Sequence, residues 1–129
     1  MTTPLVSFDH LSVSFAGERS RVRAVQEVSF TIQAGQTVGV VGESGCGKTT
    51  IGKCILQVFN PTSGEILYKG TDLLKANDKE LKAHRREIQM VFQDPYSSLN
   101  PKMNVLQNIT FGLTANQVPR DEACRRAYR

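Results

Sequence analysis

The sequence predicts an α/β fold in which an antiparallel β-layer leads into a phosphate-binding loop. Residues 42–49 read GESGCGKT, which fits the pattern G-x-x-x-x-G-K-[ST] without substitution. The loop lies between a short apolar run at residues 37–41, typical of a buried parallel strand, and a helical pattern at residues 49–56. A strand, a glycine-rich loop and a helix N-terminus together form the geometry that an anion site requires.

Three runs ahead of the loop alternate apolar and polar side chains, which is typical of strands with one exposed face. They cover residues 5–8, 11–15 and 24–32. Residues 17–20 are expected to form a turn, and Ala34-Gly35 a second turn before the buried strand. Small GTPases and nucleotide kinases usually begin almost directly with the strand before the loop, so the preceding β-layer indicates a different class.

Downstream of the loop, turn and periodicity signals define the remaining elements. The sequence predicts a turn at 60–64, a strand at 65–68 closed by Lys69-Gly70, a helix at 78–86, a strand at 88–92, a loop at 93–101, and two helices at 105–113 and 121–129. Asp78 and Asn104 are the expected N-caps of the first two helices after the strand at 65–68. Gln93 follows the carboxyl end of a strand, where ligands of α/β sheets are found.

Length and composition limit the classes of protein to which the chain can belong. With 129 residues, 40% of them hydrophobic, the chain is one globular domain at most, or part of one, and no run approaches the roughly 18 apolar residues of a membrane span. The first residues lack the features of a secretory signal, and three cysteines without paired spacing argue against a disulfide framework or a zinc site. The basic residues behind the net charge of +4 are scattered along the chain, so no nucleic-acid partner is expected. His10 and His84 have no carboxylate or cysteine at ligand spacing, and surface or capping roles are expected for both.

The chemistry of the loop follows from its residue types. Its glycines allow the backbone N–H groups from Ser44 to Thr50 to approach phosphate oxygens. Lys48 is expected to reach the β- and γ-phosphates, Thr49 to ligate Mg²⁺, and Thr50 to contact the α-phosphate. The glycine spacing differs from the G-x-G-x-x-G dinucleotide fingerprint. The candidate binding residues for a nucleoside triphosphate are Gly42, Glu43, Ser44, Gly45, Cys46, Gly47, Lys48, Thr49 and Thr50.

Four features together resemble the ATP-binding subunit of an ABC transporter: the β-layer, GESGCGKTT, NPTSGEI and MVFQDPYSSLNP. The resemblance covers residues 5–129, and the last motif resembles more narrowly the oligopeptide and dipeptide importers, a branch that includes nickel importers. It implies a P-loop NTPase fold, an ABC-type nucleotide-binding domain. Residues 1–92 would form the β-layer and P-loop core segment, and residues 93–129 the Q-loop and the start of the helical subdomain.

The same resemblance implies roles for two residues outside the loop. Phe15 stands where the family has an aromatic residue that stacks on adenine; the alternative is that Phe15 is a core residue of its strand. Gln93 resembles the Q-loop glutamine, which contacts Mg²⁺ and the attacking water. Lys48 and Gln93 are therefore the candidate catalytic residues, Thr49 and Gln93 the candidate metal ligands, and ATP and Mg²⁺ the implied cofactors.

The resemblance also implies partners. These are a second ABC ATPase subunit, in a homodimer or heterodimer, membrane permease subunits contacted through residues 93–101, and indirectly an extracytoplasmic substrate-binding protein. The implied location is peripheral, at the cytoplasmic face of the cell membrane. The implied function is ATP binding and, in the complete protein, hydrolysis that drives import of oligopeptides or dipeptides. The choice between peptide and nickel cargo stays open.

Three motifs of the family do not occur in these 129 residues: the LSGGQ signature, the Walker B strand ending in Asp-Glu, and the switch histidine. Asp94 and His84 lie at the wrong positions to replace them. The sequence therefore resembles an N-terminal portion truncated before the signature and Walker B motifs, and whether it is itself an enzyme stays open. Two alternatives remain: a nucleotide-binding fragment without turnover, and a soluble ABC-type ATPase acting on DNA.

Overall fold

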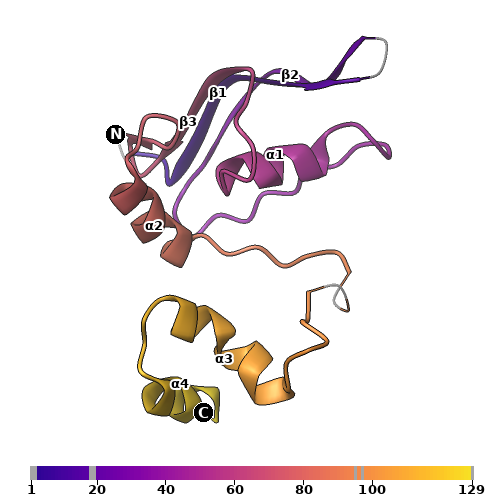
Figure 1. Cartoon of the computed structure of the whole chain (residues 1–129). Helices are drawn as coiled ribbons and strands as arrows, with labels where there is room; N and C mark the ends of the chain where they lie inside the picture. Colours follow the sequence, from indigo (N-terminus) through magenta and orange to yellow (C-terminus); the bar gives the residue numbers. More distant parts are fainter. Residues whose placement is uncertain (1–2, 18–19, 95, 97, 129) are drawn as a thin grey trace. The chain divides into compact units, whose positions relative to one another are not determined.

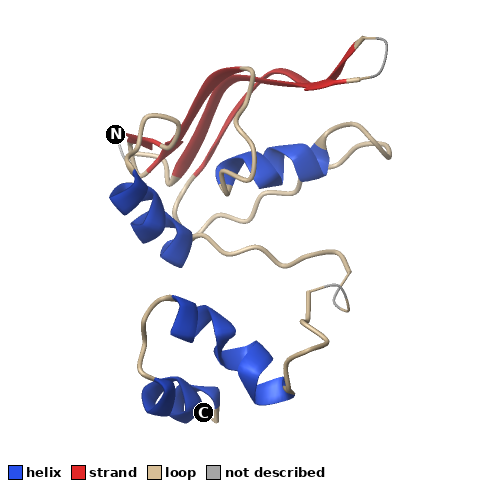
Figure 2. Ribbon diagram, in the orientation of Figure 1, coloured by secondary structure: helices blue, strands red, loops and turns tan. Residues whose placement is uncertain are grey.

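The computed structural model describes residues 3–17, 20–94, 96 and 98–128. The chain forms two compact units, Met1–Gln89 and Met90–Arg129 (Figure 1). The first unit holds all the described strands and two helices, and the second holds two further helices (Figure 2).

The strands of the first unit form one antiparallel sheet with the order β2-β1-β3-β4. Their bounds are Val6–Ala16 for β1, Arg21–Ile32 for β2, Ser63–Tyr68 for β3 and Thr71–Asp72 for β4. The antiparallel β-layer predicted from the sequence is confirmed, and so is the strand before Lys69-Gly70; the two-residue β4 had not been predicted. Within the predicted turn at 17–20, Glu18 and Arg19 lie outside the described residues.

The two apolar runs at 5–8 and 11–15 belong to a single strand, because a β-bulge joins them. Phe8 and Leu11 are three residues apart but face Phe30 and Val28, which are two apart, so β1 holds one extra residue there. His10 takes the extra position with φ 46°, and its N–H donates to Ser29 Oγ at 2.8 Å. The bulge keeps Phe8 and Leu11 on the same face of the sheet, and both are buried.

The core lies between the sheet and the helix α1, Lys48–Ile55 (Figure 1). Helix α1 places Cys54 among the buried sheet residues, and this burial raises the pKa of the Cys54 thiol to about 11. The buried cluster consists of Val6, Phe8, Leu11, Val13, Val25, Cys54, Ile66, Tyr68 and Leu73. The predicted helix after the phosphate loop is confirmed, and its attachment to the sheet holds the loop in place.

Helix α2, Asp78–Glu87, is attached to β3 by an ion-paired cluster. The Tyr68 hydroxyl donates to Glu87 Oε2 at 2.8 Å, and Lys69 Nζ lies 2.6 Å from the same oxygen. The predicted cap Asp78 is wrong: Asn77 is the N-cap, because its side chain accepts from the N–H groups of Lys79 and Glu80, and the Glu80 carboxylate accepts from Asn77 N–H in return.

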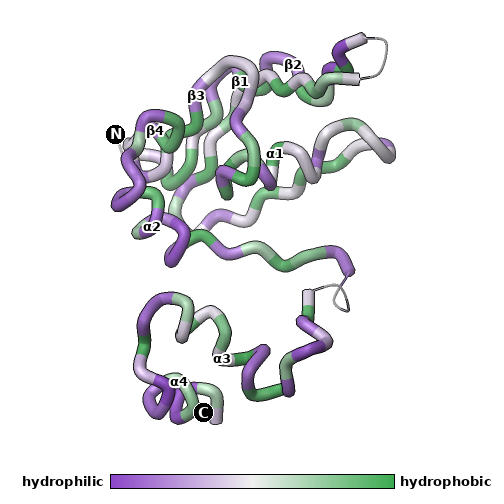
Figure 3. The backbone as a smooth tube through the Cα atoms, viewed as in Figure 1, coloured by the Kyte–Doolittle hydropathy of each residue, from purple (hydrophilic) through white to green (hydrophobic). Residues whose placement is uncertain are grey.

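The strands predicted at 37–41 and 88–92 are not strands in this structure. Both segments are irregular, and Val41 and Val91 are 93% and 96% exposed. The apolar composition does suit a buried strand, as the colouring of residues 88–92 in Figure 3 illustrates. A strand also requires a neighbour that supplies ladder hydrogen bonds, and the described sheet uses neither segment in its pairing.

The second unit contains α3, Val105–Ala115, and α4, Arg120–Ala127. Asn104 caps α3 as predicted, and Gln107 completes a capping box with it. Both predicted helices are confirmed, although Arg129 lies outside the described residues. Among the residues that the structure describes, no helix combines the length and the apolar character needed to cross a bilayer.

Candidate nucleotide-binding site

The loop at residues 42–47 folds around the ammonium group of Lys48. Lys48 Nζ donates to the carbonyl oxygen of Gly42 at 2.8 Å and to that of Glu43 at 2.6 Å, and lies 3.5 Å from Cys46 Sγ. The cation is therefore held at the centre of the loop by neutral groups of the loop itself. A phosphate oxygen, which carries charge, is a stronger partner for the ammonium than a neutral carbonyl.

Two glycines allow this close folding. A Cβ atom on Gly42 would lie 2.5 Å from Cys46 Sγ, so the thiol occupies the space that a side chain would need. Gly47 has φ 96°, and a Cβ atom there would lie 2.3 Å from the carbonyl oxygen of Ala24 and 3.0 Å from Val25 Cγ2. At Gly47 the loop consequently lies directly against the backbone of β2, which brings the phosphate loop close to the β-layer.

The N-terminus of α1 remains available to an anion. Its N-cap, Gly47, provides no side-chain hydrogen bond, and the first turn contains no acidic residue. The first N–H groups of the helix thus have no side-chain cap, and no carboxylate competes for the positive end of the helix dipole. Thr49, the candidate Mg²⁺ ligand, is exposed in this first turn, and Thr50 is half-buried beside it. These features fit a phosphate group with its metal ion.

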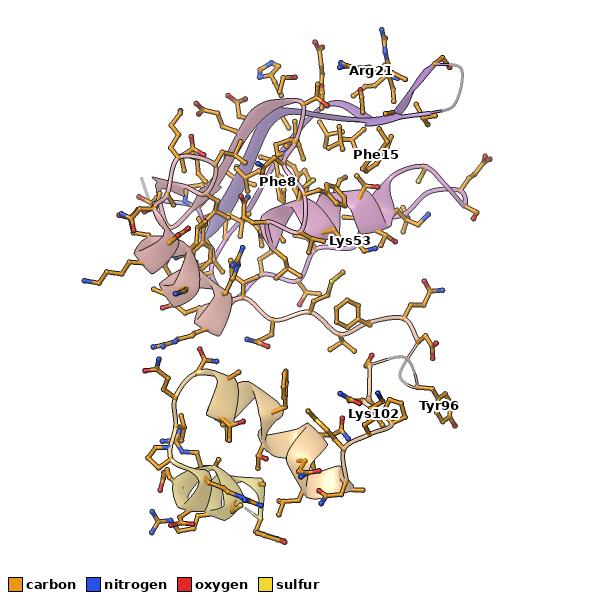
Figure 4. The ribbon with its side chains drawn as sticks, in the orientation of Figure 1. Phe8, Phe15, Arg21, Lys53, Tyr96 and Lys102 are labelled. Carbon is orange, nitrogen blue, oxygen red and sulfur yellow. The ribbon has the colours of Figure 1, made fainter. Side chains whose placement is uncertain are left out.

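Phe15 lies near the end of β1, on the side of the sheet that faces α1 (Figure 4). Its side chain is 40% exposed, and it does not belong to the buried cluster of the core. The ring meets Phe59 edge to face, with centroids 5.1 Å apart and an interplanar angle of 83°. A half-exposed aromatic ring offers a surface on which a base could stack.

Gln93 is exposed and follows the irregular segment at 88–92. It belongs to the second unit, whereas residues 42–50 and Phe15 belong to the first. In the following loop, Asp94 Oδ1 accepts from Tyr96 N–H at 3.0 Å, while Pro95 and Ser97 lie outside the described residues. The structure thus gathers the phosphate-loop residues in one unit, and the participation of Gln93 remains a prediction.

Two sets of residues that the sequence patterns had not singled out support these segments. Asn108 of α3 accepts from Asn100 N–H at 2.8 Å and donates to three backbone carbonyls, those of Asn100, Met103 and Asn104. It therefore fixes the end of the loop at 93–101 to the helix. Phe59 and Thr62 hold the connection between α1 and β3 against strand β1. The spacing of Asn104 and Asn108, one helical turn apart, was a usable signal for the first of these contacts.

The described residues contain no group of three or more His, Cys, Asp or Glu side chains that could hold a metal ion. Mg²⁺ bound with a nucleoside triphosphate does not need such a group, because it is usually held by one or two protein oxygens together with substrate phosphates and water. Thr49, an exposed residue beside the loop, carries a hydroxyl oxygen and stays the predicted ligand of that kind.

A glycine-rich loop that encloses a lysine at an uncapped helix N-terminus defines the class of P-loop nucleotide-binding proteins. The chain belongs to the ABC transporter family, whose sequence model matches residues 25–128. The resemblance inferred from the motifs is therefore confirmed.

Several curated relatives are ATP-binding proteins of peptide transporters. The chain is 57% identical over 89 residues to a probable peptide ABC transporter ATP-binding protein, y4tS, of Sinorhizobium fredii, covering 69% of this chain and 25% of that protein. It is 43% identical over 119 residues to the oligopeptide transport ATP-binding protein OppF of Bacillus subtilis, covering 92% and 39%. The chain thus spans between a quarter and two fifths of the length of these relatives.

Solved structures agree with this assignment. A dimeric ATP-binding cassette in a post-hydrolysis state, bound to ADP and phosphate, matches with a TM-score of 0.77 and 25% identity over 95% of this chain and 54% of that chain. The cbiO1 protein of Clostridium perfringens, part of the ABC transporter complex cbiONQ, matches with a TM-score of 0.73 and 25% identity over 97% and 48%. The predicted fold class, an ABC-type nucleotide-binding domain with an antiparallel β-layer, is confirmed.

Proposed function

We propose that this chain belongs to the ATP-binding subunit of an ABC importer for oligopeptides or dipeptides, in which Mg-ATP binding and hydrolysis drive transport. The observation that carries the proposal is the position of Lys48 Nζ, held by the carbonyls of Gly42 and Glu43 beside the uncapped N-terminus of α1. The peptide substrate class rests on the curated relatives described above, which are named for peptide and oligopeptide transport.

In the proposed complex, Lys48 exchanges its contacts with loop carbonyls for contacts with the β- and γ-phosphates. Because Lys48 is already positioned by the loop, little ordering of its long side chain is needed on binding. The N–H groups of residues 44–50 surround the phosphates, and Thr49 holds Mg²⁺, which offsets the charge of the phosphate oxygens. Phe15 stacks on the adenine.

In the proposed complex, Gln93 would sense whether the γ-phosphate is present. We place its side chain on Mg²⁺ and on the attacking water, with residues 94–101 against a membrane permease subunit. The support is the motif QMVFQDPYSSLNP and the fixation of Asn100 to α3 by Asn108, which gives the end of the loop a defined conformation. The subunit would act at the cytoplasmic face of the membrane, paired with a second ATPase subunit and supplied by an extracytoplasmic binding protein.

The test of nucleotide binding is Lys48→Ala in the full chain, titrated with a fluorescent ATP analogue in the presence of Mg²⁺. We expect binding to weaken at least tenfold, since a hydrogen bond to a charged group contributes about 1.5–3 kcal/mol. Lys53→Ala is the matched control, because Lys53 lies in the last turn of the same helix, away from the loop. Equal affinity of Lys48→Ala and the parent would overturn the proposed site.

A further inference from the structure

The chain leaves helix α1 in a fixed direction. Gln57 takes a left-handed conformation, with φ 55°, directly after the helix. Its N–H donates to Cys54 O at 3.0 Å, and the N–H of Val58 donates to Lys53 O at 3.1 Å. This is the Schellman arrangement, which satisfies the last carbonyls of the helix and reverses the chain. Helix α1 begins at the phosphate loop, so the position of its exit is tied to that loop.

Four residues later the same segment is attached to strand β1. Thr62 N–H donates to the carbonyl of Ser12 at 2.8 Å, and Thr62 Oγ1 accepts from Ser14 N–H at 2.8 Å. Ser14 directly precedes Phe15 in β1. The connection from α1 is therefore fastened to the backbone beside the candidate base-stacking residue.

Phe59 lies between these two attachments. Its side chain is partly buried and packs against the core, and its ring forms the edge-to-face pair with Phe15 at 5.1 Å. In an edge-to-face pair one ring covers at most one face of the other. At least one face of the Phe15 ring is therefore left uncovered by Phe59, while Phe59 restricts the rotation of Phe15 about its side-chain bonds.

We propose that Phe59 is a positioning residue for the nucleotide base: it holds the Phe15 ring in the orientation in which its free face receives adenine. The proposal rests on the proposed function, because it assumes that ATP binds at the phosphate loop. It adds a physical connection between the two ends of the nucleotide. Helix α1 begins at the phosphate loop. Through the Schellman turn at its C-terminus and through Phe59, it fixes the ring on which the base stacks.

The experiment measures dissociation constants of the full chain for two ligands with Mg²⁺: ATP and inorganic tripolyphosphate, which has no base. We expect Phe59→Ala to weaken ATP binding about three- to tenfold, the range that an aromatic pair supports, and to change tripolyphosphate binding less than twofold. Phe59→Tyr should retain the ATP affinity of the parent. In a Phe15→Ala background, Phe59→Ala should have no further effect on ATP.

The comparison of the two ligands separates positioning from folding. A variant that is merely less folded loses affinity for ATP and tripolyphosphate in the same proportion, and that outcome would overturn the inference. An undiminished effect of Phe59→Ala in the Phe15→Ala background would overturn it as well. If Lys48→Ala leaves the affinity for both ligands unchanged, the proposed function fails and the inference fails with it. Normal ATP binding by Phe59→Ala, with Lys48→Ala defective, overturns the inference alone.

Discussion

Gly47 lies at the junction of the phosphate loop and strand β2, where no side chain has room. A Cβ atom would lie 2.3 Å from the carbonyl oxygen of Ala24, in a backbone conformation with φ 96°. We predict that Gly47→Ala destabilises the fold by more than about 2 kcal/mol, since left-handed backbone alone costs about 1–2 kcal/mol for a residue with a Cβ and the steric overlap adds to it. Urea unfolding followed by circular dichroism measures the difference.

Two further glycines provide matched controls. Gly45 also has positive φ, 82°, but a Cβ atom added there would meet no neighbouring atom within 4 Å, so Gly45→Ala should show the backbone cost without the overlap. Gly39 has neither feature, and Gly39→Ala should be nearly neutral. If Gly47→Ala unfolds at the same urea concentration as Gly45→Ala, the contact between the loop and β2 is not as close as the structure has it.

The role of Phe15 can be decided by separating affinity from stability. If the ring stacks on adenine, Phe15→Ala should raise the dissociation constant for ATP, since stacking on an aromatic ring contributes about 1–3 kcal/mol per base. Phe15→Tyr and Phe15→Trp should preserve the affinity. Calorimetric titration with ATP and a thermal melt of each variant distinguish the two roles: normal ATP affinity combined with a lowered melting temperature would identify Phe15 as a core residue instead.

At the scale of elements, the contact of α2 with β3 depends on the charge of Glu87. The hydrogen bond from Lys69 and then that from Tyr68 lower the pKa of the Glu87 carboxyl. The unfolded chain therefore binds this proton more readily than the folded chain. The contribution of Glu87 is fully present above the ordinary pKa of about 4.3 and is lost as the pH falls through the lower folded value.

We therefore predict that Glu87→Gln unfolds with a weaker dependence on pH below about pH 4.3 than the parent. Urea unfolding of both proteins, at several pH values between about 3 and 6, measures the difference. Glu43→Gln is the control, since the Glu43 carboxylate makes no hydrogen bond in the described part of the chain. Parallel curves of stability against pH for Glu87→Gln and the parent would contradict the role of this carboxylate.

The elements that the sequence predicted correctly are those determined by local signals. Asn104, followed three residues later by Gln107, marks the start of α3 because a capping box needs only neighbours along the chain. The bulge at His10 was not predicted, since it depends on the register against β2. The sequence predicted Asp78 as the N-cap, whereas Asn77 holds that position: both residue types cap helices, and only the hydrogen bonds identify the cap.

In the candidate site, too, local sequence signals are separate from contacts between distant residues. The loop residues around Lys48 could be proposed as binding residues because their expected chemistry follows from a contiguous motif. Phe59 and Thr62 could not, because their importance comes from contacts with Phe15 and Ser14, 44 and 48 residues earlier in the sequence. The runs at 37–41 and 88–92 have the composition of buried strands, and composition alone does not provide the neighbouring strand that each needs.

For the molecule as a whole, we expect the 129-residue polypeptide to bind the phosphates of ATP without hydrolysing it. Hydrolysis needs a positioned water, a group that orients or deprotonates it, and stabilisation of charge at the γ-phosphate. Within these 129 residues Lys48, Thr49 and Gln93 would provide part of the phosphate and metal environment in the proposed site, while the Walker B carboxylates and the signature motif do not occur in the sequence. Val38, Val40 and Val41 form a run of exposed apolar side chains, and we expect this run to favour self-association of the isolated polypeptide.

We predict that a purified polypeptide of these 129 residues binds Mg-ATP but releases no phosphate above background. The measurement is a continuous phosphate-release assay at saturating ATP, with Lys48→Ala as the control for contaminating ATPases, and light scattering monitors association of the protein. Binding without turnover would agree with an incomplete set of catalytic groups around an intact phosphate loop. Steady turnover that disappears in Lys48→Ala would show that the groups present suffice for hydrolysis, and Gln93→Ala would then test whether Gln93 orients the water.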